Sequence, residues 1–85
     1  MSKILIYTTS ICPYCVRAKN LLKSKNLSYD EIDVTNDPAA RESLIKKANG
    51  RRTVPQIFID DKHIGGCDDL IELDNSGQLN KLVNK

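Results

Sequence analysis

Hydrophobic residues in the N-terminal part of the chain follow first a strand pattern and then a helical one. Residues 3–8 are β-branched or apolar on both faces, which is typical of a buried parallel strand. Residues 9–11 resemble a turn, and Pro13 suits the first turn of a helix. Apolar side chains then recur at helical spacing to about Lys25, at Cys15, Ala18, Leu21 and Leu22. We therefore expect a strand, a short turn and a helix in this order.

The middle of the chain predicts a second strand and a second helix. Residues 27–34 alternate between apolar and polar side chains, although the alternation is imperfect. Asn36-Asp37-Pro38 is typical of a helix N-cap, and Asn49-Gly50 is typical of a helix end. We therefore expect a helix that runs from this cap to Ala48.

The last part of the chain predicts two short strands followed by more helix. The expected elements are a strand at 56–60, a tight turn at 60–62, a short strand at 63–64, a helix over 67–73 and a last helical turn through Leu82. Gly65-Gly66 ends the short strand, and Ser76-Gly77 separates the two helical segments.

The resulting order, β-α-β-α-β-β-α, restricts the possible topologies. The first βαβ unit should cross over with a right hand between parallel strands, and the final strand pair should form an antiparallel hairpin. A chain of 85 residues is enough for one domain but not for two, so we expect residues 1–85 to form a single domain. A mixed four-stranded sheet with helices on both faces satisfies these constraints. The predicted fold is the α/β thioredoxin fold.

Composition and charge narrow the classes of partner. The net charge of +2 is small and the basic residues are spread along the chain, so a nucleic-acid partner is not expected. The apolar run at residues 4–7 is too short for a signal-peptide core or a membrane span. Three cysteines, an odd number, do not fit a secreted disulfide scaffold of this length. We expect a cytoplasmic protein, a monomer, with no membrane partner.

The run Cys12-Pro13-Tyr14-Cys15 carries the candidate chemistry. It directly follows a predicted buried strand and opens a predicted helix, which is the placement of redox C-x-x-C pairs. A thiol at a helix N-terminus faces unpaired backbone N–H groups and the positive end of the helix dipole, and both favour the thiolate. Cys12 at the N-cap is therefore the expected nucleophile. Cys15, one turn inside the helix, is the expected resolving thiol.

The cysteines allow two other interpretations. Two core cysteines at helical spacing would be structural only. A zinc site would need a tetrahedral set, for which Cys12, Cys15, His63 and Cys67 are candidates. The chain has no second C-x-x-C or H-x-H pair, and His63 should lie partly exposed in the hairpin. We therefore expect no metal site.

Three motifs in order resemble the signatures of dithiol glutaredoxins of the short bacterial type. They are Cys12-Pro13-Tyr14-Cys15, Thr53-Val54-Pro55 and Gly65-Gly66-Cys67-Asp68-Asp69. The resemblance covers essentially the whole chain. It implies a glutathione-dependent thiol–disulfide oxidoreductase that reduces protein disulfides and protein–glutathione mixed disulfides. It also implies that glutathione is a co-substrate, that no cofactor is tightly bound, and that ribonucleotide reductase is a candidate client.

The resemblance also implies a glutathione site. Pro55 would follow a cis peptide bond, Val54 would pair through its backbone with the cysteine of glutathione, and Gly66 would let the backbone approach the ligand. The N–H groups of Cys67 and Asp68 would hold the γ-glutamyl carboxylate at a helix start. The remaining implied contacts are Tyr14 and Thr53 along the groove, and Arg52, with Arg51 as a second candidate, at the glycine carboxylate.

At two positions the family pattern cannot be transferred directly to this chain. Many glutaredoxins carry a lysine shortly before the C-x-x-C motif, where this chain has Thr9. Arg17, Lys19 and Arg52 are the candidate substitutes for its charge, and glutathione binding is expected to be weaker. Cys67 is expected to be a buried thiol rather than a catalytic one.

Two rival functions stay open at this stage. A thioredoxin-like protein served by a flavoenzyme is one, but such proteins usually carry C-G-P-C and have no use for the Gly65–Asp69 segment. A metal or iron–sulfur carrier that uses Cys12 and glutathione is the other. Cluster-binding relatives usually lack proline at the second motif position, so Pro13 favours the redox enzyme.

Overall fold

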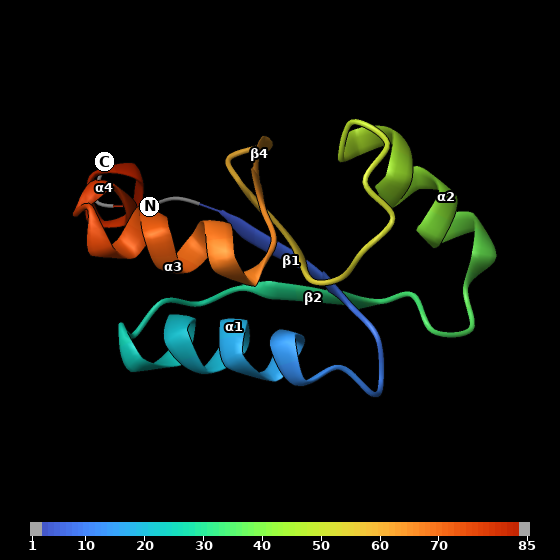
Figure 1. Cartoon of the computed structure of the whole chain (residues 1–85), viewed down its shortest axis with the longest axis horizontal. Coiled ribbons are helices and arrows are strands. Elements are labelled where there is room, and N and C mark those ends of the chain that lie inside the picture. The colour runs from blue at the N-terminus through green and yellow to red at the C-terminus, as the bar shows by residue number, and fades with distance from the viewer. Residues whose placement is uncertain (1–2, 84–85) are drawn as a thin grey trace.

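Four strands and four helices make up residues 3–83, the part of the chain that the computed structural model describes (Figure 1). In chain order they are β1 Ile4–Thr8, α1 Pro13–Ser24, β2 Asp30–Asp33, α2 Pro38–Lys47, β3 Gln56–Ile59, β4 Lys62–Gly65, α3 Cys67–Asn75 and α4 Gln78–Val83. No helix within this part of the chain is both long and apolar enough to cross a bilayer.

The strands form one mixed sheet in the order β2-β1-β3-β4. β1 runs parallel to β2, so α1 is the crossover of the predicted βαβ unit. β3 is antiparallel to both of its neighbours, β1 and β4. The predicted four-stranded mixed sheet is confirmed, and β1 and β3 are its two central strands.

Alternation along the central strands gives the sheet two apolar faces. Ile4 and Ile6 of β1 point to the face covered by α1, α3 and α4, where Ala18, Leu22, Leu70 and Leu79 complete one core. Tyr7 points to the opposite face, where Val34, Leu44, Ala48 and Phe58 form a second core beneath α2. Figure 1 shows α1 and α2 on opposite sides of the strands. Helices on both faces are therefore confirmed.

Local sequence signals place the helix starts. The Asp37 carboxylate accepts a hydrogen bond from the backbone N–H of Ala40 at 3.0 Å, and Pro38 occupies the first turn. Such a cap satisfies one of the donors that a helix start leaves unpaired. At the other end of α2, Asn49 and Gly50 take positive φ angles of 58° and 87°. The predicted cap and the predicted end of this helix are both confirmed.

The second strand is shorter than the alternation predicted. β2 covers only Asp30–Asp33, because the segment before it completes the end of α1: the Leu27 N–H donates to the Leu22 carbonyl at 3.0 Å. Leu27 and Tyr29 pack against the core without joining the sheet. Their alternation therefore reflects packing rather than strand pairing. α3 extends beyond the predicted Leu73 to Asn75.

Candidate active site

Cys12 occupies the N-cap of α1, directly after the loop that leaves β1. Its backbone is extended, with φ −156° and ψ 100°, and its Sγ accepts a hydrogen bond from the Cys15 N–H at 3.1 Å. Pro13 follows in the first turn, which contains no acidic residue. The sulfur therefore lies at the positive end of the helix, next to a donor that stabilises negative charge.

Cys15 lies one turn further along α1 in a different environment. Its side chain is buried, with 1% of its surface exposed, whereas Cys12 is half-buried. Burial, with a smaller contribution from the hydrogen bond to Cys12, raises the pKa of Cys15 to about 12. Because loss of a proton is so unfavourable, Cys15 stays a thiol at neutral pH. The two cysteines are therefore unequal.

The loop before β3 lies next to Cys12. The peptide bond between Val54 and Pro55 is cis, as the resemblance implied. The Sγ of Cys12 lies 3.7 Å from the carbonyl oxygen of Val54, to which a thiol at this position donates. The loop thus brings its backbone polar groups to the sulfur that is the candidate nucleophile.

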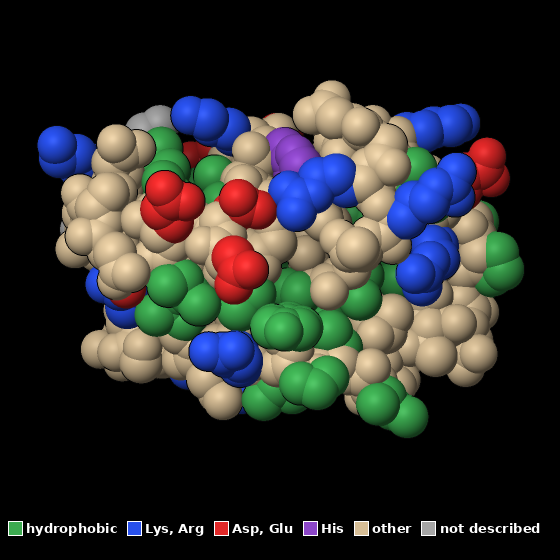
Figure 2. Space-filling model, in the orientation of Figure 1, with side chains coloured by type: hydrophobic (Ala, Val, Ile, Leu, Met, Phe, Trp, Pro, Cys, Tyr) green, Lys and Arg blue, Asp and Glu red, His purple; other side chains and the backbone are tan. Residues whose placement is uncertain are grey.

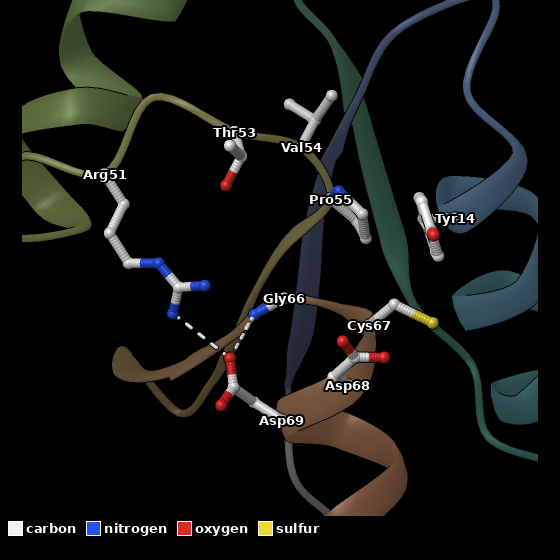
Figure 3. A pocket seen from close by; sticks show the side chains of 9 residues that line it. All are labelled: Tyr14, Arg51, Thr53, Val54, Pro55, Gly66, Cys67, Asp68 and Asp69. Carbon is white, nitrogen blue, oxygen red and sulfur yellow. Dashed lines mark hydrogen bonds and ion pairs between the residues drawn. The ribbon is translucent and has the colours of Figure 1, made fainter.

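A cavity of about 240 Å³ extends from this loop to the start of α3 (Figure 3). Seven of the predicted ligand residues line it: Tyr14, Thr53, Val54, Pro55, Gly66, Cys67 and Asp68. A Cβ at Gly66 would lie 3.4 Å from the Pro55 carbonyl oxygen, within ordinary van der Waals contact, so the start of α3 lies directly beside the cis-proline loop. Three segments far apart in the sequence therefore meet at one cavity.

Arg51, rather than Arg52, lines the cavity. The chain leaves α2 through Gly50, and the Arg51 N–H donates to the Ala48 carbonyl at 3.1 Å, which sets the direction of the side chains that follow. Arg52 is exposed, and its carbonyl accepts a bond from the Arg41 guanidinium at 3.4 Å. The structure thus brings the second of the two candidate arginines to the cavity and leaves the first outside it.

Asp69 is a site residue to which the sequence reasoning assigned no role. Its Oδ2 accepts from the Gly66 N–H at 2.9 Å and pairs with Nη1 of Arg51 at 3.1 Å (Figure 3). These two interactions, the backbone N–H first, lower the pKa of Asp69. The spacing from Gly66 to Asp69 is that of a capping box, and this signal was available in the sequence. Asp69 therefore holds Arg51 over the cavity.

The backbone corner before α3 also needs a glycine at position 65. Its φ angle is +122°, and a Cβ at this position would overlap the carboxylate of Asp69. Glycine adopts such angles without steric cost, whereas other residues rarely do. Glycine at position 65 therefore suits both the positive φ angle of this corner and the small space left beside the Asp69 and Arg51 side chains.

The cations expected to replace a lysine at Thr9 have other partners. The Arg17 guanidinium lies 5.9 Å from the centre of the Tyr14 ring, close enough for a cation–π contact. Lys19 pairs with Glu31 at 3.0 Å, and Glu31 also accepts from the buried Thr8 hydroxyl at 2.7 Å. Neither Arg17 nor Lys19 lines the cavity. Arg51 is the basic residue that does.

The candidate zinc ligands are not assembled into a site. Within residues 3–83, no three His, Cys, Asp or Glu side chains are grouped as metal ligands. His63 is half-buried in β4, and its Nε2 lies 2.7 Å from the amide oxygen of Gln56. Cys67 is buried with 4% of its surface exposed, and burial raises its pKa. The expected burial of Cys67 is confirmed.

Comparison with known proteins supplies the family. The glutaredoxin family model matches residues 4–64. The chain is 54% identical to glutaredoxin 3 of Escherichia coli over 83 residues, which cover 98% of this chain and 99% of that one. It is also 54% identical to glutaredoxin 1 of Rickettsia typhi over 81 residues, covering 94% and 78%.

Solved structures agree with this assignment. A buckwheat glutaredoxin–glutathione complex superposes with a TM-score of 0.89 at 31% identity, over 98% of this chain and 77% of that one. The solution structure of a Brucella melitensis glutaredoxin gives a TM-score of 0.84 at 46% identity, over 95% and 87%. The chain therefore belongs to the glutaredoxin family and is a glutathione-dependent thiol–disulfide oxidoreductase.

Proposed function

We propose that this protein reduces protein–glutathione mixed disulfides and protein disulfides through a Cys12 thiolate, with Cys15 as the resolving thiol. The observation that carries the proposal is the inequality of the two cysteines. Cys12 is accessible at a helix start and accepts a backbone N–H, whereas Cys15 is buried and has a pKa of about 12. A nucleophile must be accessible and must lose its proton, and the burial and raised pKa of Cys15 oppose both, which leaves Cys12 as the nucleophile.

The reaction with a mixed disulfide needs Cys12 alone. The thiolate of Cys12 attacks the glutathione sulfur, a new S–S bond forms to glutathione, and the protein sulfur leaves as a thiolate that takes up a proton. A second glutathione, as its thiolate, then attacks the glutathione sulfur held on Cys12. Glutathione disulfide leaves and the Cys12 thiolate is restored. Over the cycle one glutathione thiol is oxidised and the protein sulfur is reduced, because the glutathione that arrives on the substrate is already part of a disulfide.

The reaction with a protein disulfide needs both cysteines. Cys12 attacks one substrate sulfur, and the other substrate sulfur leaves as a thiolate. Cys15 then loses its proton to that leaving thiolate or to solvent and attacks the Cys12 sulfur, which gives a Cys12–Cys15 disulfide and a reduced substrate. Two glutathiones reduce this disulfide and become glutathione disulfide. The raised pKa of Cys15 keeps it protonated until the mixed disulfide has formed.

The cavity supports glutathione as the ligand. The buckwheat relative with a TM-score of 0.89 was solved as a glutaredoxin–glutathione complex. In this chain the Val54 backbone would pair with the cysteine of glutathione, and the N–H groups of Cys67 and Asp68 would hold its γ-glutamyl carboxylate. An arginine beside the cavity suits the glycine carboxylate. We propose Arg51 for this contact in place of Arg52, because Arg51 lines the cavity and Arg52 does not.

Apolar side chains around Cys12 support access by protein substrates. Ile11, Tyr14 and Val16 are exposed large hydrophobic residues, with 92%, 52% and 50% of their surfaces accessible. Figure 2 shows hydrophobic side chains gathered on the part of this face that covers α1. We propose that disulfide-bonded and glutathionylated proteins dock here. A cytoplasmic location, a monomeric state and ribonucleotide reductase as a client stay predictions.

Cysteine variants test the assignment of roles. Cys12→Ser should abolish reduction of both a glutathionylated peptide and a protein disulfide, because it removes the nucleophile. Cys15→Ser should keep the first activity and lose most of the second. Lys62→Gln changes an exposed residue outside the cavity and is the control, which should retain turnover in both assays. If Cys15→Ser lost deglutathionylation while Cys12→Ser retained it, the proposed roles would be reversed.

The electron donor separates this proposal from its rivals. Oxidised enzyme should be reduced in an assay coupled to glutathione reductase and not in one coupled to thioredoxin reductase. The opposite result would favour a thioredoxin-like reductant. Iron bound stoichiometrically to the purified protein would favour a cluster carrier.

A further inference from the structure

Gln56 is a fully buried polar residue at the boundary between the cis-proline loop and β3. It directly follows Pro55, and none of its surface is exposed. Its strand neighbour on the same face, Phe58, belongs to the core beneath α2. A buried amide group is costly unless its donors and acceptor are all engaged. The hydrogen-bond partners of the Gln56 side chain therefore determine whether its burial is tolerated.

Each end of the Gln56 amide has a partner. Its Nε2 donates to the backbone carbonyl of Thr53 at 3.0 Å and lies 3.3 Å from the Thr53 hydroxyl. Its Oε1 lies 2.7 Å from Nε2 of His63. Thr53 lines the cavity beside Arg51 and Val54, as Figure 3 shows. A chain of hydrogen bonds thus connects β4 to the wall of the glutathione cavity.

The direction of this chain follows from the donors and acceptors available. The Thr53 carbonyl can only accept, so the NH₂ group of Gln56 must face it and the amide oxygen must face His63. An oxygen can only accept, so His63 must carry a proton on Nε2 and donate it. Burial, and next the charge of Arg51, lower the pKa of His63, which favours the neutral ring with its single proton on Nε2. His63 therefore donates to Gln56, and Gln56 donates to Thr53.

The β3–β4 hairpin holds the imidazole in this place. His63 is the register partner of Phe58, and a shift in register separates this pair from Ile57 and Gly65. The His63 and Phe58 rings lie 5.0 Å apart between centroids. The chain has one histidine, and Figure 2 shows it at the surface next to basic side chains. The ring is thus packed on one side and is available to hydrogen-bond Gln56.

We propose that Gln56 and His63 are positioning residues that hold the Thr53–Pro55 loop in the conformation that binds glutathione. The inference rests on the proposed function, because it concerns the same cavity. Without the donor from His63, the Gln56 oxygen is left unpaired in a buried place and the amide is free to turn away from Thr53. The Thr53 carbonyl then loses its partner, and the backbone of Val54 is no longer held against the ligand. The effect falls on glutathione binding, because the Cys15 N–H at the start of α1, which stabilises negative charge on the Cys12 sulfur, does not belong to this loop.

Four variants test this proposal. His63→Phe keeps an aromatic ring against Phe58 and removes the donor, whereas His63→Gln places an amide N–H near the position of Nε2. Gln56→Glu keeps the acceptor for His63 and removes the donor to Thr53. Lys62→Gln changes an exposed residue of the same strand and is the matched control.

Three measurements are made on each variant: the KM for glutathione with a protein disulfide as substrate, where the first glutathione enters the empty cavity to reduce the Cys12–Cys15 disulfide, the rate of Cys12 alkylation by iodoacetamide without glutathione, and the Tm. His63→Phe and Gln56→Glu should raise the KM for glutathione about three- to tenfold, the effect of one lost buried hydrogen bond. Their alkylation rates should stay within about twofold of the original, because the Cys15 N–H that donates to the Cys12 sulfur lies on α1 and not on the loop. His63→Gln should recover most of the original KM, and Lys62→Gln should match the unmodified protein.

The outcomes separate this proposal from the proposed function. If the unmodified protein did not use glutathione at all, the proposed function would fail and this inference with it. If the unmodified protein were active and both His63→Phe and Gln56→Glu kept its KM, only the positioning role would be overturned. A fall in Tm and alkylation rate with no selective change in KM would also overturn it, since that pattern indicates a structural role alone. Should His63→Phe not fold, the KM of Gln56→Glu decides the matter.

Discussion

Replacing Asp69 should destabilise the protein by an amount that follows from its two contacts. In Asp69→Ala, the Gly66 N–H loses its acceptor at the start of α3, which costs about 1 kcal/mol for a lost helix cap. The ion pair with Arg51 is 45% and 44% exposed, so solvent screening limits its contribution to about 0.5 kcal/mol. The expected total is about 1.5 kcal/mol of unfolding free energy.

Thermal denaturation followed by circular dichroism measures this loss. For a domain of this size, a loss of about 1.5 kcal/mol lowers the Tm by about 6–12 °C. Asp69→Asn is the matched control, because its side-chain oxygen can still accept from Gly66 while the charge that pairs with Arg51 is gone. Its Tm should fall by only about 2–4 °C.

The pH dependence of the same experiment has a definite sign. The folded protein lowers the pKa of Asp69, so its carboxylate contributes stability above the pKa of the unfolded chain and loses it as the pH falls through the folded value. The difference in Tm between the original protein and Asp69→Ala should therefore be full at pH 7 and shrink below about pH 4. An equal loss in the Asn and Ala variants, or a difference that grows in acid, would refute the reasoning.

Three further results are expected. In Cys12→Ser, alkylation of Cys15 should stay slow up to about pH 9, because burial raises the pKa of Cys15 to about 12. In Cys15→Ser, the remaining active-site thiol should react readily at neutral pH. Mass spectrometry of the alkylated peptides measures the two rates. Arg51→Gln should raise the KM for glutathione about fivefold and Arg52→Gln less than about twofold, since only the first side chain lines the cavity. Leu44→Ala should lower the free energy of unfolding in urea by about 2–4 kcal/mol, because it empties a fully buried position beneath α2.

A specific result would contradict each of these three predictions. Rapid labelling of the buried thiol near pH 9 would mean that burial does not control its ionisation. A larger effect at Arg52 than at Arg51 would restore the arginine first expected from the sequence. A Leu44 variant as stable as the original would mean that α2 contributes little to the second core.

Local signals account for the elements that could be predicted from the chain. The continuous apolar run of β1 and the helical recurrence from Cys15 to Leu22 are both patterns within a single element, so they are visible without knowledge of what packs against it. The Asp37-Pro38 cap is equally local, because a side chain bonds to a backbone three residues away. For the same reason, the N-cap placement of Cys12 followed from the sequence. Ordered motifs then indicated the family.

Contacts between distant segments decided the remaining features. The antiparallel pairing of β1 with β3, which puts both strands at the centre of the sheet, joins residues about fifty positions apart. Arg51 and Arg52 are neighbours of the same type, and the direction in which the chain leaves Gly50 determines which of them reaches the cavity. No periodicity encodes that direction.

The hydrogen bonds that support the loop at the cavity also divide into a part visible in the sequence and a part set by the tertiary structure. The motif residues Thr53, Val54 and Pro55 were recognisable from the sequence, but the hydrogen bonds from His63 through Gln56 to Thr53 were not. A buried glutamine in a strand has no local signature, because its partners depend on the register of β3 and β4. The sequence therefore determined the reactive cysteines and their helix, and the tertiary structure decided which side chains surround and hold the loop that faces them. The physical reason is that helix starts and periodicities are set within a few residues, whereas a cavity is set by how separate strands align.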